Sequence, residues 1–197
     1  MEKNWGIHLI KSEVESGLYK ASYFVERSFG NLICLTPPEV ISDNNHEIIN
    51  FITQKGGIAY QIPSSNSMPN HSQKILYERF GAPYLYSRDS QELRDLGKQN
   101  HDFRYILYGT EFFDHRVEFG NILGNEVILI DKGSIPFIFF PNPFFYDRGN
   151  IRLGINGEAI KKLEVKDNTY VKTLDNAKFL FHYYRGVNWC DGGNYVK

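Results

Sequence analysis

The residues best suited to chemistry lie in the polar segment 64–70 and directly after it. Asn66, Met68, Asn70 and His71 follow one another at spacings of one or two residues. Imidazole binds transition metals and transfers protons near neutral pH, whereas amide oxygens suit calcium and are poor zinc ligands. The segment therefore offers one strong metal ligand, His71, among neutral side chains. The structural alternative is a histidine held by hydrogen bonds at the start of a helix.

Two predicted elements position this polar segment. Residues 56–63 form an apolar run that predicts a short buried strand. Pro69 can open a helix, and apolar residues recur at helical spacing as far as Phe80. Gly81 followed by Pro83 predicts the end of that helix. The segment thus connects the end of a strand to the start of a helix.

The order strand, loop, helix, Gly-Ala-Pro turn and second short strand resembles the core of the metallo-β-lactamase superfamily. In that family the loop carries the metal ligands of a His-x-His-x-Asp-His motif. Aligned on the last histidine of the motif, this chain has Asn66, Met68 and Asn70 at the other ligand positions. Of the four ligands, this chain therefore keeps His71 alone.

Two further ligand positions follow from the same resemblance. The family has a Pro-Gly-His-Thr-Pro-Gly turn before a strand, and residues 120–131 match its glycine spacing with Asn121 in place of the histidine. The family's next apolar strand ends in Gly-Asp, whose aspartate bridges two metals. Residues 135–145 contain such a strand, with Asn142 in place of the aspartate. We expect Asn121 and Asn142 to lie in the same cleft as His71.

The resemblance covers roughly residues 18–187. An upstream strand that ends in Asp-Pro or Asp-Thr in the family here ends in Thr36-Pro37. The last family ligand, in a Gly-His-Gly sequence, has no clear match, since His182 comes a few residues early.

The substitutions all replace metal-binding histidine or aspartate side chains by neutral side chains that bind metals weakly. Clustered carboxylates without cations repel each other, and an asparagine at an aspartate position removes that repulsion while nearly keeping its shape. This pattern fits a cleft that keeps its form without a metal. The alternative is that the asparagines cap helices and stabilise turns. We therefore expect no cofactor, with a single weakly bound divalent metal on His71 as the alternative.

Composition limits the class of protein. The chain has 197 residues, of which 42% are hydrophobic, and a formal net charge of −1. It can bury a core and has no bulk attraction to nucleic acid or to anionic membranes. It has no apolar stretch of about 18 residues, the length that a membrane span needs. The charged start and the isolated Cys34 and Cys190 lead us to expect a cytoplasmic protein without a secretory signal.

The remaining pattern mixes strands and helices. Residues 18–26 and 31–40 predict strands joined by a turn at Gly30, and strand patterns recur from residue 103 onward. Helices are expected over 45–55, where Gly56 and Gly57 are the stop signal, over 87–98 and near 168–180. Together with the resemblance, this pattern predicts one domain, 1–197. Its fold class is α/β, a four-layer αβ/βα sandwich of two mixed β-sheets flanked by helices.

Three functions are compatible with these residues. The first is a non-catalytic relative of the family that binds a small ligand or a protein in the old cleft. The second is a metal-dependent hydrolase with an atypical or mononuclear site centred on His71, and the third is a structural subunit. The two prolines that follow the strand ending at Phe140 predict that Phe144, Phe145 and Tyr146 leave the sheet as a loop. These rings could cover the cleft or form an aromatic patch for a homodimer.

Overall fold

The computed structural model describes fourteen stretches of the chain. They are residues 6–28, 30–38, 46–63, 71–87, 103–106, 110–112, 115–122, 125–131, 136–141, 144–147, 150–153, 158–159, 177–185 and 189–191. The chain divides into two compact units, Met1–Lys11 with Ser22–Leu107 and Ser12–Ala21 with Tyr108–Lys197. The single domain over residues 1–197 stays a prediction.

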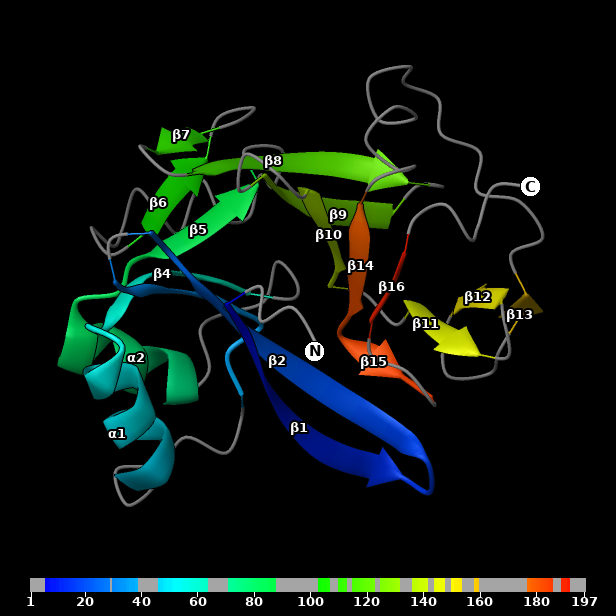
Figure 1. Ribbon diagram of the computed structural model, residues 1–197, viewed down its shortest axis with the longest axis horizontal. Coiled ribbons are helices and arrows are strands. Elements are labelled where there is room, and N and C mark those ends of the chain that lie inside the picture. Colours follow the sequence, from blue (N-terminus) through cyan, green and yellow to red (C-terminus); the bar gives the residue numbers. More distant parts are fainter. Residues whose placement is uncertain are drawn as a thin grey trace. The chain divides into compact units, whose positions relative to one another are not determined.

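A mixed sheet with two helices forms most of the first unit (Figure 1). Its strand order is β1-β2-β3-β4-β5-β6, and β15 also pairs with β2. The strands are β1 (Ile7–Glu15), β2 (Leu18–Glu26), β3 (Leu32–Leu35), β4 (Ile58–Ile62), β5 (Tyr84–Ser87), β6 (Phe103–Ile106) and β15 (Tyr183–Tyr184), and the helices are α1 (His46–Gln54) and α2 (His71–Phe80). Strand β15 and the ends of β1 and β2 nearest their connecting turn belong to the second unit.

Parallel pairing in this sheet comes from the helical crossovers. Strands β2 and β3 are antiparallel, whereas β3, β4, β5 and β6 pair in parallel. Helix α1 connects β3 to β4, and α2 connects β4 to β5, as parallel neighbours require. The strand and helix predicted on either side of the polar segment 64–70 are therefore confirmed as β4 and α2.

Glycine stop signals end both helices as expected. Gly81 has a φ of +65°, and its N–H donates to the carbonyl of Tyr77 across 2.8 Å. After α1, Gly56 has a φ of +81°, and a Cβ there would lie 2.1 Å from the carbonyl oxygen of Gly30. Gly30 lies in the predicted turn between β2 and β3, so this turn and the end of α1 approach each other too closely for any side chain at position 56.

Apolar residues of both helices pack on the sheet of the first unit. The cluster contains strand residues and the helix residues Ile49, Ile52, Ile75 and Leu76. Buried Cys34 belongs to it and has a free thiol. This packing fixes both helices against the strands that they connect.

The second unit contains a six-stranded and a three-stranded sheet. The larger sheet has the order β16-β14-β10-β9-β8-β7, and it is mixed because β10 and β14 are parallel while the other pairs that carry a register are antiparallel. Its strands are β7 (Thr110–Phe112), β8 (His115–Ile122), β9 (Asn125–Asp131), β10 (Pro136–Phe140), β14 (Lys178–Phe181) and β16 (Trp189–Asp191). The smaller sheet contains β11 (Phe144–Asp147), β12 (Asn150–Leu153) and β13 (Glu158–Ala159).

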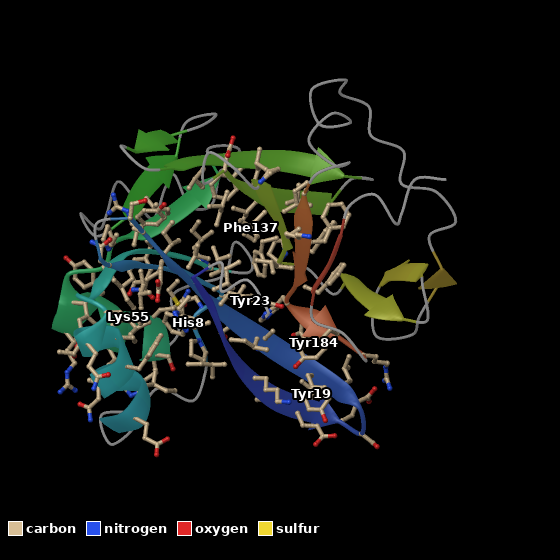
Figure 2. All side chains as sticks on the ribbon, viewed as in Figure 1. His8, Tyr19, Tyr23, Lys55, Phe137 and Tyr184 are labelled. Carbon is tan, nitrogen blue, oxygen red and sulfur yellow. The ribbon has the colours of Figure 1, made fainter. Side chains whose placement is uncertain are left out.

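Phenylalanine rings fill the interior around β10 and β14. The ring of Phe140 stacks on that of Phe181 at a centroid distance of 5.2 Å and meets the Phe179 ring edge-on at 5.5 Å. Outside the larger sheet, Tyr19 of β2 stacks on Tyr184 of β15 at 5.4 Å (Figure 2). The aromatic excess of the sequence is thus partly used inside this unit.

Two predicted elements are wrong. The helix expected near 168–180 is wrong at its end, because Lys178–Phe181 pairs with β10 as a parallel strand. Residues 144–146 leave the larger sheet as expected, but they form strand β11 and not a loop, because a proline removes one hydrogen bond without preventing a new strand directly after it. The helix expected over 87–98 lies outside the described residues, except for Ser87 at the end of β5.

In the part of the chain that the structure describes, neither helix is long and apolar enough to cross a membrane.

Candidate functional site

The candidate site lies where β3 and β4 end. These strands are parallel, so their carboxyl ends meet at one edge of the sheet, the edge at which open α/β folds bind ligands. The N–H of Thr36, directly after β3, donates to the carbonyl of Ile62, the last residue of β4, across 2.7 Å. Pro63 follows, and the polar segment 64–70 then begins. The segment that sequence analysis singled out therefore starts at this edge.

Thr36 is held in a strained backbone conformation at the edge. Its φ of +49° is the one positive value at a non-glycine position among the described residues. For a β-branched residue this left-handed conformation costs on the order of 1–3 kcal/mol. Thr36 is buried, and its hydroxyl donates to the carbonyl of Leu35 across 2.7 Å. Such strain persists where surrounding structure enforces it, and it gathers at binding and active sites.

His71 is the first residue of α2, and it is exposed. The next two residues, Ser72 and Gln73, are buried polar residues of the same first turn. The helix predicted after the polar segment is therefore confirmed and leaves His71 accessible at its start, while Pro69, the residue expected to open it, lies outside the described residues. Asn66, Met68 and Asn70 lie outside the described residues.

Gln61 of β4 fixes α2 at both of its ends. Its buried side-chain Nε2 donates to the carbonyl of Gln73 and to that of Ala82, each across 3.0 Å. The Oε1 atom of the same side chain is buried and has no hydrogen-bond partner among the described residues. One amide thus sets the position of the helix that carries His71, at the cost of an unpaired acceptor.

The other two predicted site residues belong to the second unit. Asn121 is the last residue but one of β8 and lies opposite Glu126 of β9. The following strand predicted here is confirmed as β9, and Asn121 lies within the β8–β9 ladder, whereas residues 123 and 124 lie outside the described residues. Asn142 lies outside the described residues, two positions after the end of β10 at Phe140. The convergence of the six cleft residues stays a prediction.

Comparison with known proteins identifies the fold. No family model and no curated protein matches the sequence. Among solved structures, a metallo-β-lactamase from Pontibacter korlensis matches with a TM-score of 0.53 at 10% identity, over 94% of each chain. A metallo-β-lactamase from Hirschia baltica matches with a TM-score of 0.53 at 8% identity, also over 94% of each chain. The chain has the metallo-β-lactamase fold. The fold class predicted from the sequence is therefore confirmed.

The residues at hand do not fit the dinuclear metal centre that this fold usually holds. Such a centre needs several imidazoles and at least one carboxylate. The six positions matched by sequence supply one imidazole, one thioether and four neutral amides. Within the described stretches, no group of three or more His, Cys, Asp or Glu side chains could hold a metal ion.

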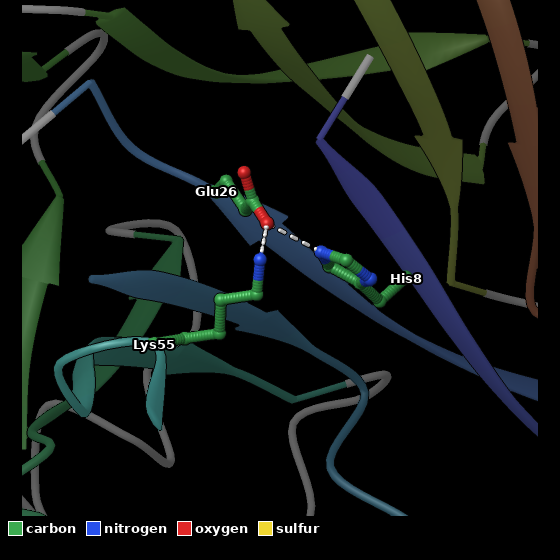
Figure 3. Close-up of polar contacts among 3 residues, drawn as sticks. All are labelled: His8, Glu26 and Lys55. Carbon is green, nitrogen blue, oxygen red and sulfur yellow. Dashed lines mark hydrogen bonds and ion pairs between the residues drawn. The ribbon is translucent and has the colours of Figure 1, made fainter. Parts of the chain in front are cut away.

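A second polar cluster, which sequence analysis missed, joins His8, Glu26 and Lys55 (Figure 3). The Nε2 atom of His8 lies 2.6 Å from the Glu26 carboxylate, which also forms an ion pair with the ammonium group of Lys55. The His8 ring meets the Phe51 ring edge-on at 4.9 Å. The hydrogen bond from Lys55, followed by that from His8, lowers the pKa of the Glu26 carboxyl. These half-exposed groups connect β1 and β2 to the turn after α1.

His182 is a buried structural residue of the second unit. Its Nδ1 donates to the carbonyl of Ala21 across 2.6 Å, and its backbone N–H donates to the carbonyl of Phe140 across 3.1 Å. His182, which lies a few residues before the position of the family's last ligand, is therefore a structural residue that connects β15 to β2 and β10.

Burial raises the pKa of the Cys34 thiol in the first unit well above its usual range, which keeps the thiol protonated and unreactive.

Proposed function

We propose that this protein is a degenerate member of the metallo-β-lactamase superfamily that binds a small ligand or a protein without metal-dependent catalysis. One observation carries the proposal. At the matched ligand positions the chain has neutral amides and a thioether around a single histidine. Neutral groups donate and accept hydrogen bonds, whereas they do not balance the charge of two divalent cations.

The geometry of the first unit supports binding at this edge. Gln61 holds α2 firmly, and Thr36 is kept in a strained conformation beside the start of the polar segment. A site held in place before binding loses less conformational entropy when its ligand arrives. Rigid strands and a helix on both sides of a polar segment are the usual supports of a binding loop.

The alternative function is a hydrolase with one metal centred on His71. The exposure of this ring at the start of α2 favours that alternative, because a ligand must be accessible to take up a metal. The substrates typical of the superfamily, thioesters, phosphodiesters and lactams, would then be the class to test.

The partners follow from composition and remain part of the proposal. A net charge of −1 favours a small molecule or a protein over nucleic acid or an anionic membrane. The cysteine usage favours a cytoplasmic location. A homodimer through the aromatic residues around Phe144 is a further part of the proposal.

Elemental analysis of protein purified without chelators tests this proposal. We expect less than about a tenth of an equivalent of transition metal per chain, because even catalytic zinc needs three protein ligands. One or two tightly held ions per chain would overturn the proposal. A weakly held ion that the His71→Ala variant loses, together with hydrolysis that depends on it, would establish the alternative.

Calorimetric titration of compound pools and of cell extract fractions, at matched protein concentrations, tests the binding half of the proposal. The variant for comparison is Thr36→Gly, which relaxes the strained position at the edge. We expect a ligand whose affinity falls in this variant while the fold is kept. A ligand that binds both proteins equally would place binding elsewhere.

A further inference from the structure

We propose that strand β1 is a homodimer interface, at which two copies of the chain pair their β1 strands antiparallel and continue the sheet. Within the described part of the chain, β1 is the outermost strand of its sheet and has β2 on one side (Figure 1). Its other edge presents a row of backbone N–H and C=O groups that can pair with another strand. At nine residues, β1 is long for an edge strand.

The exposed apolar side chains of the described residues gather on this strand. The large hydrophobic side chains that stay exposed are Leu9 and Val14, with exposed fractions of 36% and 53%. Both belong to β1, whereas the apolar side chains of β3 next to the helices are buried. Exposed apolar side chains beside a strand edge that no other described strand covers are typical of a surface to which another strand can be added.

Symmetry limits the registers that two β1 strands can adopt. In an antiparallel pair related by a two-fold axis, one residue must face its own copy across the axis, because facing residues point to the same side of the sheet. An axis at Lys11 or at Glu13 would place two like charges opposite each other, which is unfavourable. An axis at Ile10 would leave Lys11 and Glu13 opposite the apolar residues Leu9 and Ile7.

An axis at Ser12 makes the strand complementary to itself. Lys11 then faces the partner's Glu13, and by symmetry Glu13 faces the partner's Lys11. Ile10 faces the partner's Val14 in the same way. Leu9 faces the partner's Glu15, so this register has one kind of apolar–charged pair where the axis at Ile10 has two. Cross-strand pairs of opposite charge and of β-branched residues both stabilise antiparallel sheets. This register selects a second copy of the chain as the occupant, because the complementarity is between β1 and its own sequence.

The apolar pair would extend an existing core. Ile10 is partly buried and packs against the apolar cluster between the sheet and the helices. In the Ser12 register the partner's Val14 would lie beside Ile10 on this face and cover the exposed remainder of its side chain. The contact is limited to one strand from each copy, so we expect a weak dimer that forms with rising concentration.

Charge reversal in the two facing residues tests the register. Sedimentation equilibrium across a wide concentration range should show that Lys11→Glu and Glu13→Lys each raise the dimer dissociation constant at least about tenfold, since each like-charge contact occurs twice. An equimolar mixture of the two variants should dimerise again. In the mixed dimer the two acidic side chains of the Lys11→Glu copy face the two basic side chains of the Glu13→Lys copy. The double variant, which exchanges the two charges within one chain, should dimerise like the native protein.

The controls separate this interface from other effects. Glu47→Lys makes the same charge change on an exposed face of α1 and should leave dimerisation unchanged. Glu13→Gln preserves an acceptor for the N–H of Gly17, to which the Glu13 carboxylate is bonded, and should weaken the dimer less than Glu13→Lys. Circular dichroism should show that all variants are folded.

Three outcomes would overturn the proposal. The first is a chain that stays monomeric at every concentration, which would leave the edge for an extended segment of another protein. The second is a dimer that neither single variant weakens, and the third is a mixture of the two variants that fails to recover it.

Discussion

The side-chain Nε2 of Gln61 lies 3.0 Å from the backbone carbonyl oxygen of Ala82, so that a central strand is bonded to the residues that end α2. The same nitrogen bonds Gln73 in the first turn of the helix. The second unit shows a similar device, since the buried His182 bonds the carbonyl of Ala21. In both places a buried polar side chain positions neighbouring segments, which an apolar residue of the same size could not do.

We expect that Gln61→Met, which keeps the volume and removes the amide, lowers the free energy of unfolding by about 1–3 kcal/mol. Two buried carbonyls lose their donor, while removal of the unpaired Oε1 offsets part of the loss. Urea unfolding measures the change. Gln54→Met, at an exposed position of α1, is the matched control and should be nearly neutral. Equal losses in the two variants would contradict the role given to Gln61.

The Thr36→Gly variant should stay within about 1 kcal/mol of the native unfolding free energy, because relief of the strained φ offsets the added entropy of the unfolded chain. Thr53→Gly is the control within α1, where the threonine hydroxyl donates to the carbonyl of Ile49. A glycine there should cost about 1 kcal/mol or more. If Thr36→Gly were the more damaging of the two, the strain at the edge would be outweighed by contacts of the threonine side chain.

Much of the fold could be predicted because its signals are local. The turn at Gly30 and the helix ends at Gly56 and Gly81 depend on glycines that adopt positive φ, and each was read from neighbouring residues. Strand β11 has no such local signal, because the prolines before Phe144 favour a loop there. Pairing with β12, which settles the matter, involves residues further along the chain.

The candidate site was less predictable, because much of it depends on contacts between residues far apart in the sequence. The polar segment was found because it lies between two recognisable elements. The cluster of His8, Glu26 and Lys55 could not be found, since its hydrogen bonds connect residues 18 and 29 positions apart. The strain at Thr36 has no local signal either, because threonine disfavours the conformation that the surrounding structure imposes on it.

The ion pairs of Glu26 should make stability depend on pH. Because the pKa of Glu26 is lowered in the folded protein, its ionised form stabilises the fold above the unfolded value of about 4.3. This contribution is lost as the pH falls through the lower, folded pKa. We expect Glu26→Gln to lower the unfolding free energy at pH 7 by about 1 kcal/mol or less, as half-exposed ion pairs do.

The difference between native protein and Glu26→Gln should vanish at pH values below the folded pKa of Glu26, where the native carboxyl is also neutral. Unfolding curves recorded from pH 7 down to the acid limit of the fold test this. Glu47→Gln, at an exposed position of α1, is the control and should show a smaller difference at neutral pH. A difference for Glu26→Gln that persists unchanged in acid would mean that its ion pairs are not the cause.

The last prediction concerns the aromatic residues of β11. Phe144 faces Leu153 of β12, and Phe145 faces Arg152. Neighbours in a strand point to opposite faces, so we expect one of the two rings to be buried and the other to be open to solvent. Phe144→Ser and Phe145→Ser should then differ, with a loss of roughly 1.5–3 kcal/mol for the buried ring and little for the other. Thermal unfolding and sedimentation of both variants and of the double variant measure stability and oligomeric state together.

If these rings cover the cleft, the double variant loses stability and its self-association stays that of the native chain, with the β1 interface intact. If they form the contact patch of a homodimer, stability stays close to native and the dimer is lost, while charge reversal in β1 has no effect. The two interfaces are therefore distinguished by the same sedimentation experiment. Variants that change neither property would show that β11 is an ordinary solvated strand, and they would remove the aromatic residues from both explanations.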